Sequence, residues 1–327
     1  MKKCARRDRR MNTHHRPPTT DHFLHHPMNN NSIPIRSLHR ILTVPICALL
    51  LTVAIARAET VENIDKTFDV KPGGQLVVDV DFGSIEVATQ TTDQVVIHVT
   101  RRVSRGAKPD EEAFLQDRPV MITQEGETLT IRSKGITKNS WSWKGRQRVD
   151  GKYVISLPAK FNARLRTSGG GIEVSGLDGE VKVNTSGGNI RVEGGGGSLE
   201  GHTSGGSVDV KSFRGPVQAN TSGGNVRLEA VTGVVEGSTS GGSVTASLTA
   251  VADSVKLSTS GGNVTLRVPA GAAFDLDAST SGGSAGCDLP VTVTGKRSGS
   301  RLKGPVNGGG KPVVLRSSGG DVWVKKI

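Results

Sequence analysis

The sequence predicts an all-β fold: a β-solenoid of about 18 residues per rung, two short strands in each rung, with an N-terminal β-rich cap. The first observation is a repeated tetrapeptide, Thr-Ser-Gly-Gly, whose copies follow in steps of 18, 18, 18, 18, 20 and 21 residues. The copies begin at Thr167, Thr185, Thr203, Thr221, Thr239, Thr259 and Thr280. The second is that β-branched and polar residues alternate between the copies, which is typical of half-buried strands. The third is composition, because 43 glycines and only 3% aromatic residues argue against an ordinary helical or α/β core.

Residues 1–58 are predicted to be a leader that contains a signal peptide. An apolar run, Ile41–Ile55, follows basic residues and precedes the small-residue motif Ala56-Arg57-Ala58. This arrangement predicts cleavage after Ala58, with translation starting at Met28. The alternative is an uncleaved anchor, although the run is shorter than the ~20 residues that span a bilayer. We therefore expect an exported protein of the periplasm or of the cell surface and extracellular space.

The net charge of +12 is concentrated in this leader, which holds ten Lys and Arg residues and two acids. The remaining 269 residues carry 32 basic and 28 acidic side chains, a net charge of +4. This balance excludes a polycationic nucleic-acid binder. Only Cys287 remains after the leader, so a disulfide-stapled scaffold is excluded as well.

Residues 59–160 are predicted to form the β-rich cap. Alternating apolar residues predict strands at 76–88, 94–103, 119–124, 127–133 and 152–159. Pro109, followed by acidic residues, predicts a short helix over 109–117. A cap here would shield the open sheet edge at one end of the solenoid from aggregation.

Residues 161–327 are predicted to be the Gly-rich solenoid. Each repeat offers one strand after its Gly pair and a second before the next Thr, and stacking of the rungs would bury the apolar face that both strands share. Two columns of charge alternate in sign, which favours stacking of the rungs in register at ~4.8 Å. The columns are Glu173, Arg191, Asp209, Arg227 and Glu193, Lys211, Glu229.

The end of the chain is predicted to continue the stack. A degenerate copy, Ser-Ser-Gly-Gly at 317–320, follows Thr280 after 37 residues, which leaves room for one weaker rung near 307–310. The final strand ends in Lys325 and Lys326, and we expect these charges to protect the far sheet edge.

Several of these motifs together resemble one known family. The segment FGSIEV at 82–87, the segment 157–170 that leads into the first TSGG, the iterated TSGG strands and the closing 304–324 are similar to the bacterial putative-adhesin β-strand-repeat family. The similarity covers nearly all of the chain after the leader. It implies a β-solenoid in the cell envelope, and because the function of that family is unknown it supplies no catalytic residues.

The repeat itself is interpreted as structural. The Thr column is expected to satisfy turn backbone at a corner, with the neighbouring Gly residues at positive φ, rather than to bind ice. Calcium is excluded because Arg191 and Arg227 stand where a calcium-binding roll needs Asp. Only His98 and His202 remain after the leader, and Cys287 is expected to fill core space. We therefore expect no metal, no cofactor and no enzymatic activity.

One segment of the sequence is a candidate binding site. Residues 132–148 carry six cations and no acid, with two of the three Trp residues of the chain. The hypothesised binding residues are Trp141, Trp143, Lys144, Arg146 and Arg148. Cations beside amphipathic indoles suit anionic surfaces. The alternative is a solvated loop whose Trp residues pack on the cap.

Three functions stay open at this point. The first is a non-enzymatic envelope or cell-surface module, an adhesin or an envelope-binding protein, whose partner is an anionic envelope glycan, a lipid surface or another envelope protein. The second is a structural or stress-responsive envelope scaffold that binds another protein. The third is a glycan-processing β-helix enzyme, which would require carboxylates clustered in a cleft.

Overall fold

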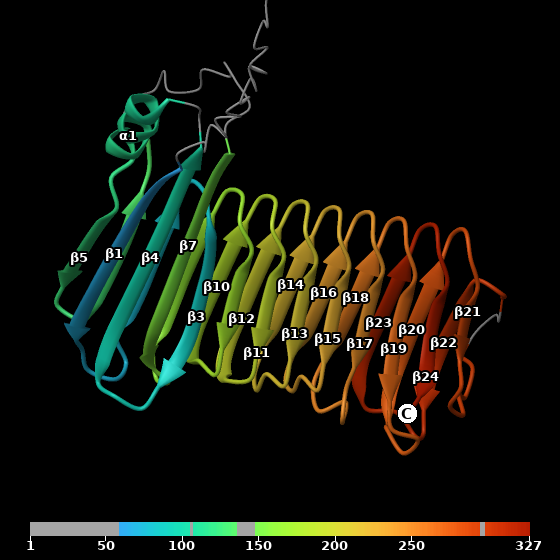
Figure 1. Cartoon of the computed structure of the whole chain (residues 1–327). Coiled ribbons are helices and arrows are strands. Elements are labelled where there is room, and N and C mark those ends of the chain that lie inside the picture. The colour runs from blue at the N-terminus through green and yellow to red at the C-terminus, as the bar shows by residue number, and fades with distance from the viewer. Residues whose placement is uncertain (1–58, 105–106, 136–147, 295–297) are drawn as a thin grey trace, which may run out of the picture. The chain divides into compact units, whose positions relative to one another are not determined.

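The computed structural model describes residues 59–104, 107–135, 148–294 and 298–327, which lie within one compact unit, Ile55–Ile327. These residues form two twelve-stranded sheets, here called sheet A and sheet B, and a single short helix (Figure 1). Among them, no helix is long and apolar enough to cross a membrane. The fold is therefore the predicted all-β solenoid.

The repeat region supplies one strand to each sheet per rung. The strands of sheet A follow the Gly pairs and are β9 (Ile172–Ser175), β11 (Ile190–Glu193), β13 (Val208–Lys211), β15 (Val226–Glu229), β17 (Val244–Ser247) and β19 (Val264–Val268). The strands of sheet B precede the next Thr and are β8 (Asn162–Thr167), β10 (Asp178–Thr185), β12 (Gly196–Thr203), β14 (Val217–Thr221), β16 (Val235–Thr239) and β18 (Val255–Thr259). Neighbouring strands of both series are parallel.

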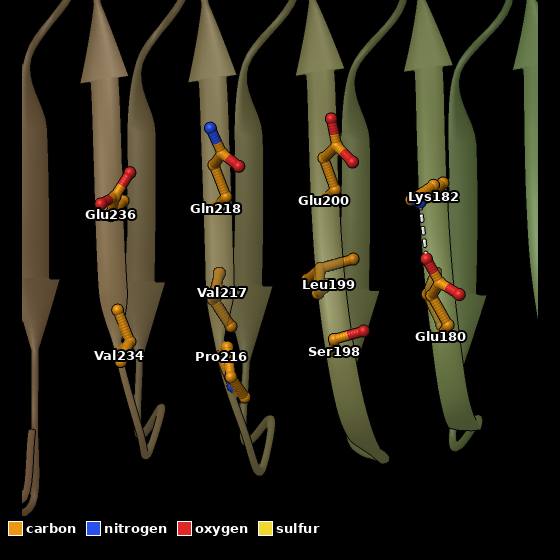
Figure 2. Close-up of a pocket in the computed structure, with 11 residues that line it drawn as sticks. Glu180, Lys182, Ser198, Leu199, Glu200, Pro216, Val217, Gln218, Val234 and Glu236 are labelled. Atoms are coloured by element: carbon orange, nitrogen blue, oxygen red, sulfur yellow. Dashed lines mark ion pairs between the residues drawn. The ribbon is translucent and has the colours of Figure 1, made fainter.

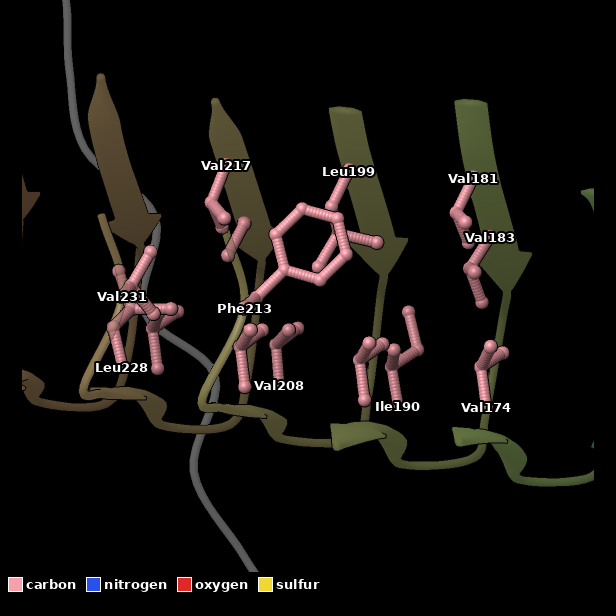
Figure 3. Packing of buried hydrophobic residues seen from close by; sticks show 14 of the residues in the cluster. Val174, Val181, Val183, Ile190, Leu199, Val208, Phe213, Val217, Leu228 and Val231 are labelled. Atoms are coloured by element: carbon pink, nitrogen blue, oxygen red, sulfur yellow. The ribbon is translucent and has the colours of Figure 1, made fainter. Parts of the chain in front are cut away.

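The rungs stack in the register that the charge columns predict. Arg191 lies opposite Glu173 on one side and opposite Asp209 on the other. The Thr residues of successive TSGG copies, from Thr167 to Thr259, also lie opposite one another. The alternation of β-branched residues then places one apolar layer per sheet inside the coil, where Val181 and Leu199 of sheet B face Ile190 and Val208 of sheet A (Figure 3). Each rung therefore buries the face of its neighbour, which explains why the period persists.

The N-terminal region extends both sheets. It contributes β1 (Thr60–Asp69), β2 (Gln75–Val80), β3 (Ser84–Gln90), β4 (Gln94–Ser104), β5 (Met121–Glu125), β6 (Thr128–Ser133) and β7 (Arg148–Pro158). The helix α1 (Lys108–Asp117) is present as predicted. Strand β1 pairs antiparallel with β4. It had not been predicted, because its apolar residues, Val61, Ile64 and Phe68, are three and four positions apart and do not alternate.

The prediction of one strand over 76–88 is wrong. The chain turns at Gly83, whose φ of 104° is in the left-handed region, so that β2 enters sheet B and β3 enters sheet A. Together they form a complete rung, which lies between β6/β7 and β8/β9. In this rung Val80 occupies the place of the repeat Thr, directly opposite Thr167.

The C-terminal end does not stack in chain order. It comprises β20 (Phe274–Thr280), β21 (Ala285–Cys287), β22 (Arg301–Val306), β23 (Lys311–Ser317) and β24 (Val322–Lys326). Strand β23 lies between β18 and β20, and β24 lies between β19 and β21. The last coil of the chain is thus inserted before the coil that precedes it (Figure 1).

Two predictions about this end are therefore wrong. Lys325 and Lys326 do not protect the sheet edge, because β21 lies outside β24. The segment before residue 311 forms no weaker rung, because β22 turns back antiparallel to β20 and closes sheet B.

Candidate functional site

The predicted basic Trp segment lies largely outside the described residues. Trp141, Trp143, Lys144 and Arg146 are not described, and Arg148 is the first residue of β7, where its backbone pairs with that of Ser104. Two described residues on the N-terminal side of the segment, Lys134 and Gly135, contact the rest of the protein.

Both residues contact aspartates of the segment 79–81. The ammonium of Lys134 lies 2.9 Å from Asp79 Oδ1 and 3.4 Å from Asp81 Oδ1. The backbone N–H of Gly135 donates to Asp81 Oδ2 at 2.9 Å. One cation of the basic Trp segment, Lys134, is therefore already paired with acidic neighbours.

The Thr column is the corner ladder that the sequence predicts. The buried hydroxyl of Thr203 donates to the carbonyl of Gly188 in the preceding rung at 2.8 Å and accepts the N–H of Gly206 at 3.3 Å. The other members make the first of these bonds in the same way: Thr167, Thr185, Thr221, Thr239, Thr259 and Thr280, with Ser317 in the inserted coil. Because these hydroxyls are buried and occupied, the column presents nothing to a partner.

The glycines of TSGG are required for a different reason from the one predicted. None of them has φ in the left-handed region. Instead, a Cβ on the second Gly of a copy would overlap the carbonyl oxygen of the preceding rung, as at Gly206 against Gly188. The first Gly of the same copy, Gly205, has no heavy atom closer than 3.5 Å to such a Cβ. Close backbone approach, and not positive φ, therefore selects glycine at the fourth position.

The residue after each Gly pair forms a second polar ladder. Asn189 Oδ1 accepts the N–H of Ser207 at 2.8 Å, and Ser207 Oγ accepts the N–H of Asn225 at 3.1 Å. The pattern continues through Ser243 to Asn263. These amides and hydroxyls satisfy backbone that would otherwise be unpaired at the turn, so we assign them a structural role.

Sheet A presents two rows of outward side chains. The first outward row, in spatial order, is Glu173, Arg191, Asp209, Arg227, Thr245, Thr265, Trp323 and Gly286. The second outward row is Glu193, Lys211, Glu229, Ser247, Arg267 and Lys325. Lys211 and Glu229 approach to 3.7 Å. A shallow hollow of about 370 Å³ lies between Asp209, Asn225, Arg227 and Thr245.

Sheet B also presents an outward face with a shallow hollow, and acids predominate among the charged residues of this hollow. A hollow of about 410 Å³ is lined by Glu180, Lys182, Glu200, Gln218 and Glu236, which point outward from successive strands (Figure 2). Lys182 binds Glu180 at 2.6 Å, and this hydrogen bond holds the pKa of that carboxyl below its usual value. The two remaining acids, Glu200 and Glu236, lie on either side of Gln218, and the hollow is open rather than enclosed.

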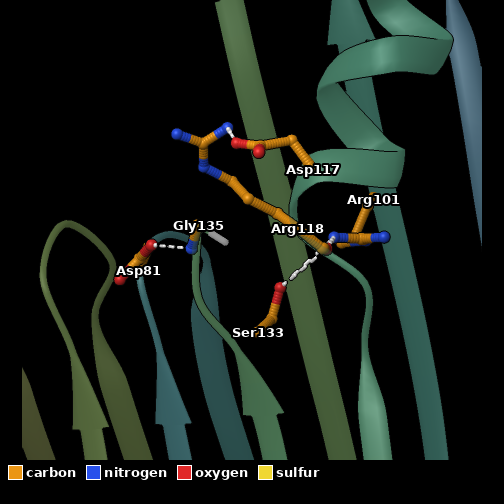
Figure 4. Close-up of polar contacts among 6 residues, drawn as sticks. All are labelled: Asp81, Arg101, Asp117, Arg118, Ser133 and Gly135. Carbon is orange, nitrogen blue, oxygen red and sulfur yellow. Dashed lines mark hydrogen bonds and ion pairs between the residues drawn. The ribbon is translucent and has the colours of Figure 1, made fainter. Parts of the chain in front are cut away.

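The N-terminal end contains a buried polar cluster (Figure 4). The guanidinium of Arg101 is fully buried and binds Glu62, the backbone carbonyl of Arg118 at the end of α1, and Ser133 Oγ. Ser133 Oγ in turn donates to the same carbonyl at 3.3 Å. Burial raises the pKa of the neighbouring Tyr153 hydroxyl. The cluster joins β1, β4, β6 and α1, and it lies inside the protein rather than on a ligand-accessible surface.

The residues for metal or nucleophilic chemistry are dispersed. In the described parts of the chain, no three His, Cys, Asp or Glu residues come together in a way that could hold a metal ion. His98 contacts Asp65 at 2.6 Å on an exposed strand face, while His202 lies opposite Asn184 and Asn220 in sheet B. Cys287 is half-buried opposite Val324, and burial raises the pKa of its thiol.

Sequence reasoning did not single out the C-terminal end of sheet A. Trp323 is 36% exposed there, in the first outward row. Extending the two charge columns past Arg227 and Glu229 would have shown that the alternation of sign stops, but the inserted order of the last coil hides which residues become neighbours.

Comparisons with known proteins identify one family and several distant solved structures. A family model described as Toastrack DUF4097 matches residues 75–325. A solved structure described as a putative adhesin from Bacteroides fragilis NCTC 9343 is 14% identical and covers 81% of this chain and 97% of its own, with a TM-score of 0.44. A putative adhesin from Parabacteroides merdae ATCC 43184 is 14% identical over 81% of this chain and 96% of its own, with a TM-score of 0.38.

A putative lipid binding protein from Parabacteroides distasonis ATCC 8503 is also 14% identical over 81% of this chain and 96% of its own, with a TM-score of 0.30. No curated protein matches. The family model extends from β2 into β24 and so includes every rung of the solenoid. The chain belongs to the Toastrack DUF4097 family.

Proposed function

We propose that this protein is an exported, non-enzymatic module of the periplasm or cell surface that binds an anionic component of the envelope. The observation that carries the proposal is the separation of roles within each rung. Inward positions are apolar or have their hydroxyls bonded to the turns, whereas outward positions differ from rung to rung and are displayed in straight rows. A regular display of this kind suits an extended partner, as in other repeat proteins.

The proposed contact includes the segment predicted from the sequence, Trp141, Trp143, Lys144, Arg146 and Arg148. The choice rests on the sequence, because the structure describes only the flanks of the segment, where β6 ends at Ser133 and β7 begins at Arg148. Cations and indoles between these two points would pair with phosphate or carboxylate groups of a glycan or lipid surface.

The test is a pull-down of the full chain on lipopolysaccharide, anionic liposomes and peptidoglycan at increasing salt. The variant carries Trp141→Ala, Trp143→Ala, Arg146→Ala and Arg148→Ala. The control carries Lys66→Ala and Lys256→Ala, which removes an equal number of positive charges, two, from exposed positions elsewhere. We expect binding that weakens with salt, is lost in the variant and persists in the control.

Loss of binding in both altered proteins would indicate a nonspecific charge effect and would contradict the proposed contact. A correctly folded wild type that binds none of the three surfaces would contradict envelope binding itself. The scaffold function, with another envelope protein as partner, would then be the better proposal.

A further inference from the structure

The outward face of sheet A changes character towards its C-terminal end. In the first outward row, the sign of charge alternates through Glu173, Arg191, Asp209 and Arg227 and then gives way to Thr245. In the second outward row, the alternation ends at Glu229. The residues beyond this point are Thr265, Arg267, Trp323, Lys325 and Gly286, and we call them the terminal patch.

The two cations of the terminal patch lie directly opposite each other. Arg267 of β19 pairs in register with Lys325 of β24, and both are exposed. Neither forms an ion pair or a side-chain hydrogen bond with any residue that the structure describes. Like charges in directly opposite positions destabilise a sheet, and earlier in the same row Lys211 lies between Glu193 and Glu229. Two other like-charged pairs, Arg164 with Lys182 and Glu86 with Glu173, each include a residue that is ion-paired to an opposite charge. The pair of Arg267 and Lys325 has no such compensation among the described residues.

Two acidic residues lie nearby, Asp288 and Asp321. The backbone N–H of Asp288, on the outer strand, donates to the carbonyl of Val324 at 2.9 Å. Its side chain makes no ion pair of 4.0 Å or less within the described chain. Asp321, two residues before Trp323, is exposed, and its Oδ1 accepts the N–H of Ser284 at 2.8 Å. The terminal patch and its surroundings thus hold two cations and two carboxylates, and the two cations lie directly opposite each other.

The indole of Trp323 is fixed on the sheet. Gly286 is its register partner on the outer strand, and a Cβ at Gly286 would lie less than 3.0 Å from three atoms of the six-membered ring. The ring therefore covers the glycine, while Thr265 occupies the other side of the row. With 36% of its surface exposed, Trp323 offers an aromatic platform whose position is set before any partner arrives.

We propose that the terminal patch binds a carboxylated saccharide. A sugar ring would stack on the exposed part of Trp323, and its carboxylate would accept hydrogen bonds from Arg267 and pair with Lys325. The proposal rests on the proposed envelope-binding function and names a second contact with its chemical class. It uses only residues of β19, β21 and β24.

An anionic membrane fits the terminal patch less well. Burial in the headgroup region requires apolar side chains that protrude, to a depth of about 5–10 Å. Trp323 instead lies against the sheet, and its row neighbours, Thr265 and Gly286, are small. Ile327, 61% exposed, follows further along the same chain segment and makes vesicles the necessary comparison.

The test is calorimetric titration of the full chain with oligogalacturonate, with its methyl-esterified form and with vesicles containing phosphatidylserine. Trp323→Ala removes the platform, and Arg267→Gln with Lys325→Gln removes the charge. Lys66→Gln with Lys256→Gln is the control of equal charge, and thermal unfolding confirms that each variant is folded. We expect each terminal-patch variant to weaken oligogalacturonate binding by about tenfold or more, and the control by less than about twofold. The methyl ester should bind like the charge variant.

Equal binding of oligogalacturonate by the wild type and both terminal-patch variants would overturn the proposal, as would no binding by the wild type. Vesicle binding that needs Trp323 without saccharide binding would assign the patch to a lipid surface instead. If envelope pull-down persists in the terminal-patch variants while oligogalacturonate never binds, this inference fails and the proposed function stands. If the wild type is also not pulled down by any of the three envelope surfaces, both the saccharide inference and the proposed envelope-binding function fail.

Discussion

At the scale of single residues, the TSGG repeat meets two structural requirements, one through its Thr and one through its second Gly. The Thr hydroxyl bridges a turn to the rung before it, and the second Gly lets the two backbones meet closely enough for that bond to form. Ser317 shows that the hydroxyl matters more than the methyl group, because it donates to Gly262 at 2.8 Å in the same geometry. The sequence alone predicted the hydroxyl ladder but could not separate a glycine needed for φ from a glycine needed for space.

Substitution of the two glycines of one copy separates these reasons. Gly206→Ala would place its Cβ in overlap with the Gly188 carbonyl, a backbone atom that cannot move without opening the stack. We expect a loss of about 2–4 kcal/mol in the free energy of unfolding, measured by urea titration. The control Gly205→Ala, with its nearest heavy atom 3.5 Å away, should change stability by less than about 1 kcal/mol. Equal losses would contradict the close-approach explanation.

The half-buried Cys287 allows a prediction about pH. Burial raises the pKa of its thiol, so the reactive thiolate forms at higher pH in the folded protein than in the unfolded chain. In a Cys4→Ser, Cys47→Ser background, the midpoint of the pH profile for alkylation should lie above that of the same protein in denaturant. A midpoint at or below the denatured value would show that the thiol is solvated and does not pack beside the core.

At the scale of elements, the helix α1 is held to the sheets by polar contacts as well as by packing. Arg101 binds the carbonyl at the end of α1, and Glu111 of α1 accepts both the N–H and the hydroxyl of Thr60 in β1, the hydroxyl at 2.6 Å. The ring of Phe114 packs against that of Phe82, with 5.8 Å between the ring centroids. Helix and strand signals in the sequence predicted α1 and β4 but not β1. Arg101 is in phase with the buried residues Val95, Ile97 and Val99 of β4, but its partners come from β1, β6 and the end of α1, which the sequence does not bring together.

Replacement of this arginine should release the corner of the cap. Arg101→Ala removes the partner of the 34% exposed Glu62, leaves the carbonyl of Arg118 with the Ser133 hydroxyl, and opens a void in the cluster, so we expect about 2–4 kcal/mol of destabilisation in urea titration. Hydrogen exchange of β1 and α1 should accelerate more than that of β12 and β14. Its exposed neighbour supplies the control, since Arg102→Ala should cost less than about 0.5 kcal/mol. Uniform acceleration across the solenoid would argue against a local anchor.

At the scale of the whole described unit, sequence periodicity predicted the solenoid because each rung repeats the same register of apolar and polar residues. It could not predict the order of the last coils. Leu276 and Ala278 of β20 and Val313 and Leu315 of β23 present the same inward alternation, so either strand satisfies the apolar pattern of β18. The hairpin between β20 and β22 resolves the ambiguity, because β22 occupies the outer side of β20 and leaves its inner side to β23.

This inserted order gives the last coil an interior role that a truncation can test. Removing residues 311–327 takes out β23 and β24, so that β18 and β19 lose their outer partners, while β20 keeps only β22 and β21 loses its partner. Because each rung contacts only its neighbours, we expect hydrogen exchange to show loss of protection in β18–β22 and retained protection in β10–β14. Removing only Ile327 should leave the pattern unchanged, since its side chain is exposed. Retained protection throughout β18–β22 in the longer truncation would contradict the interior role of the last coil.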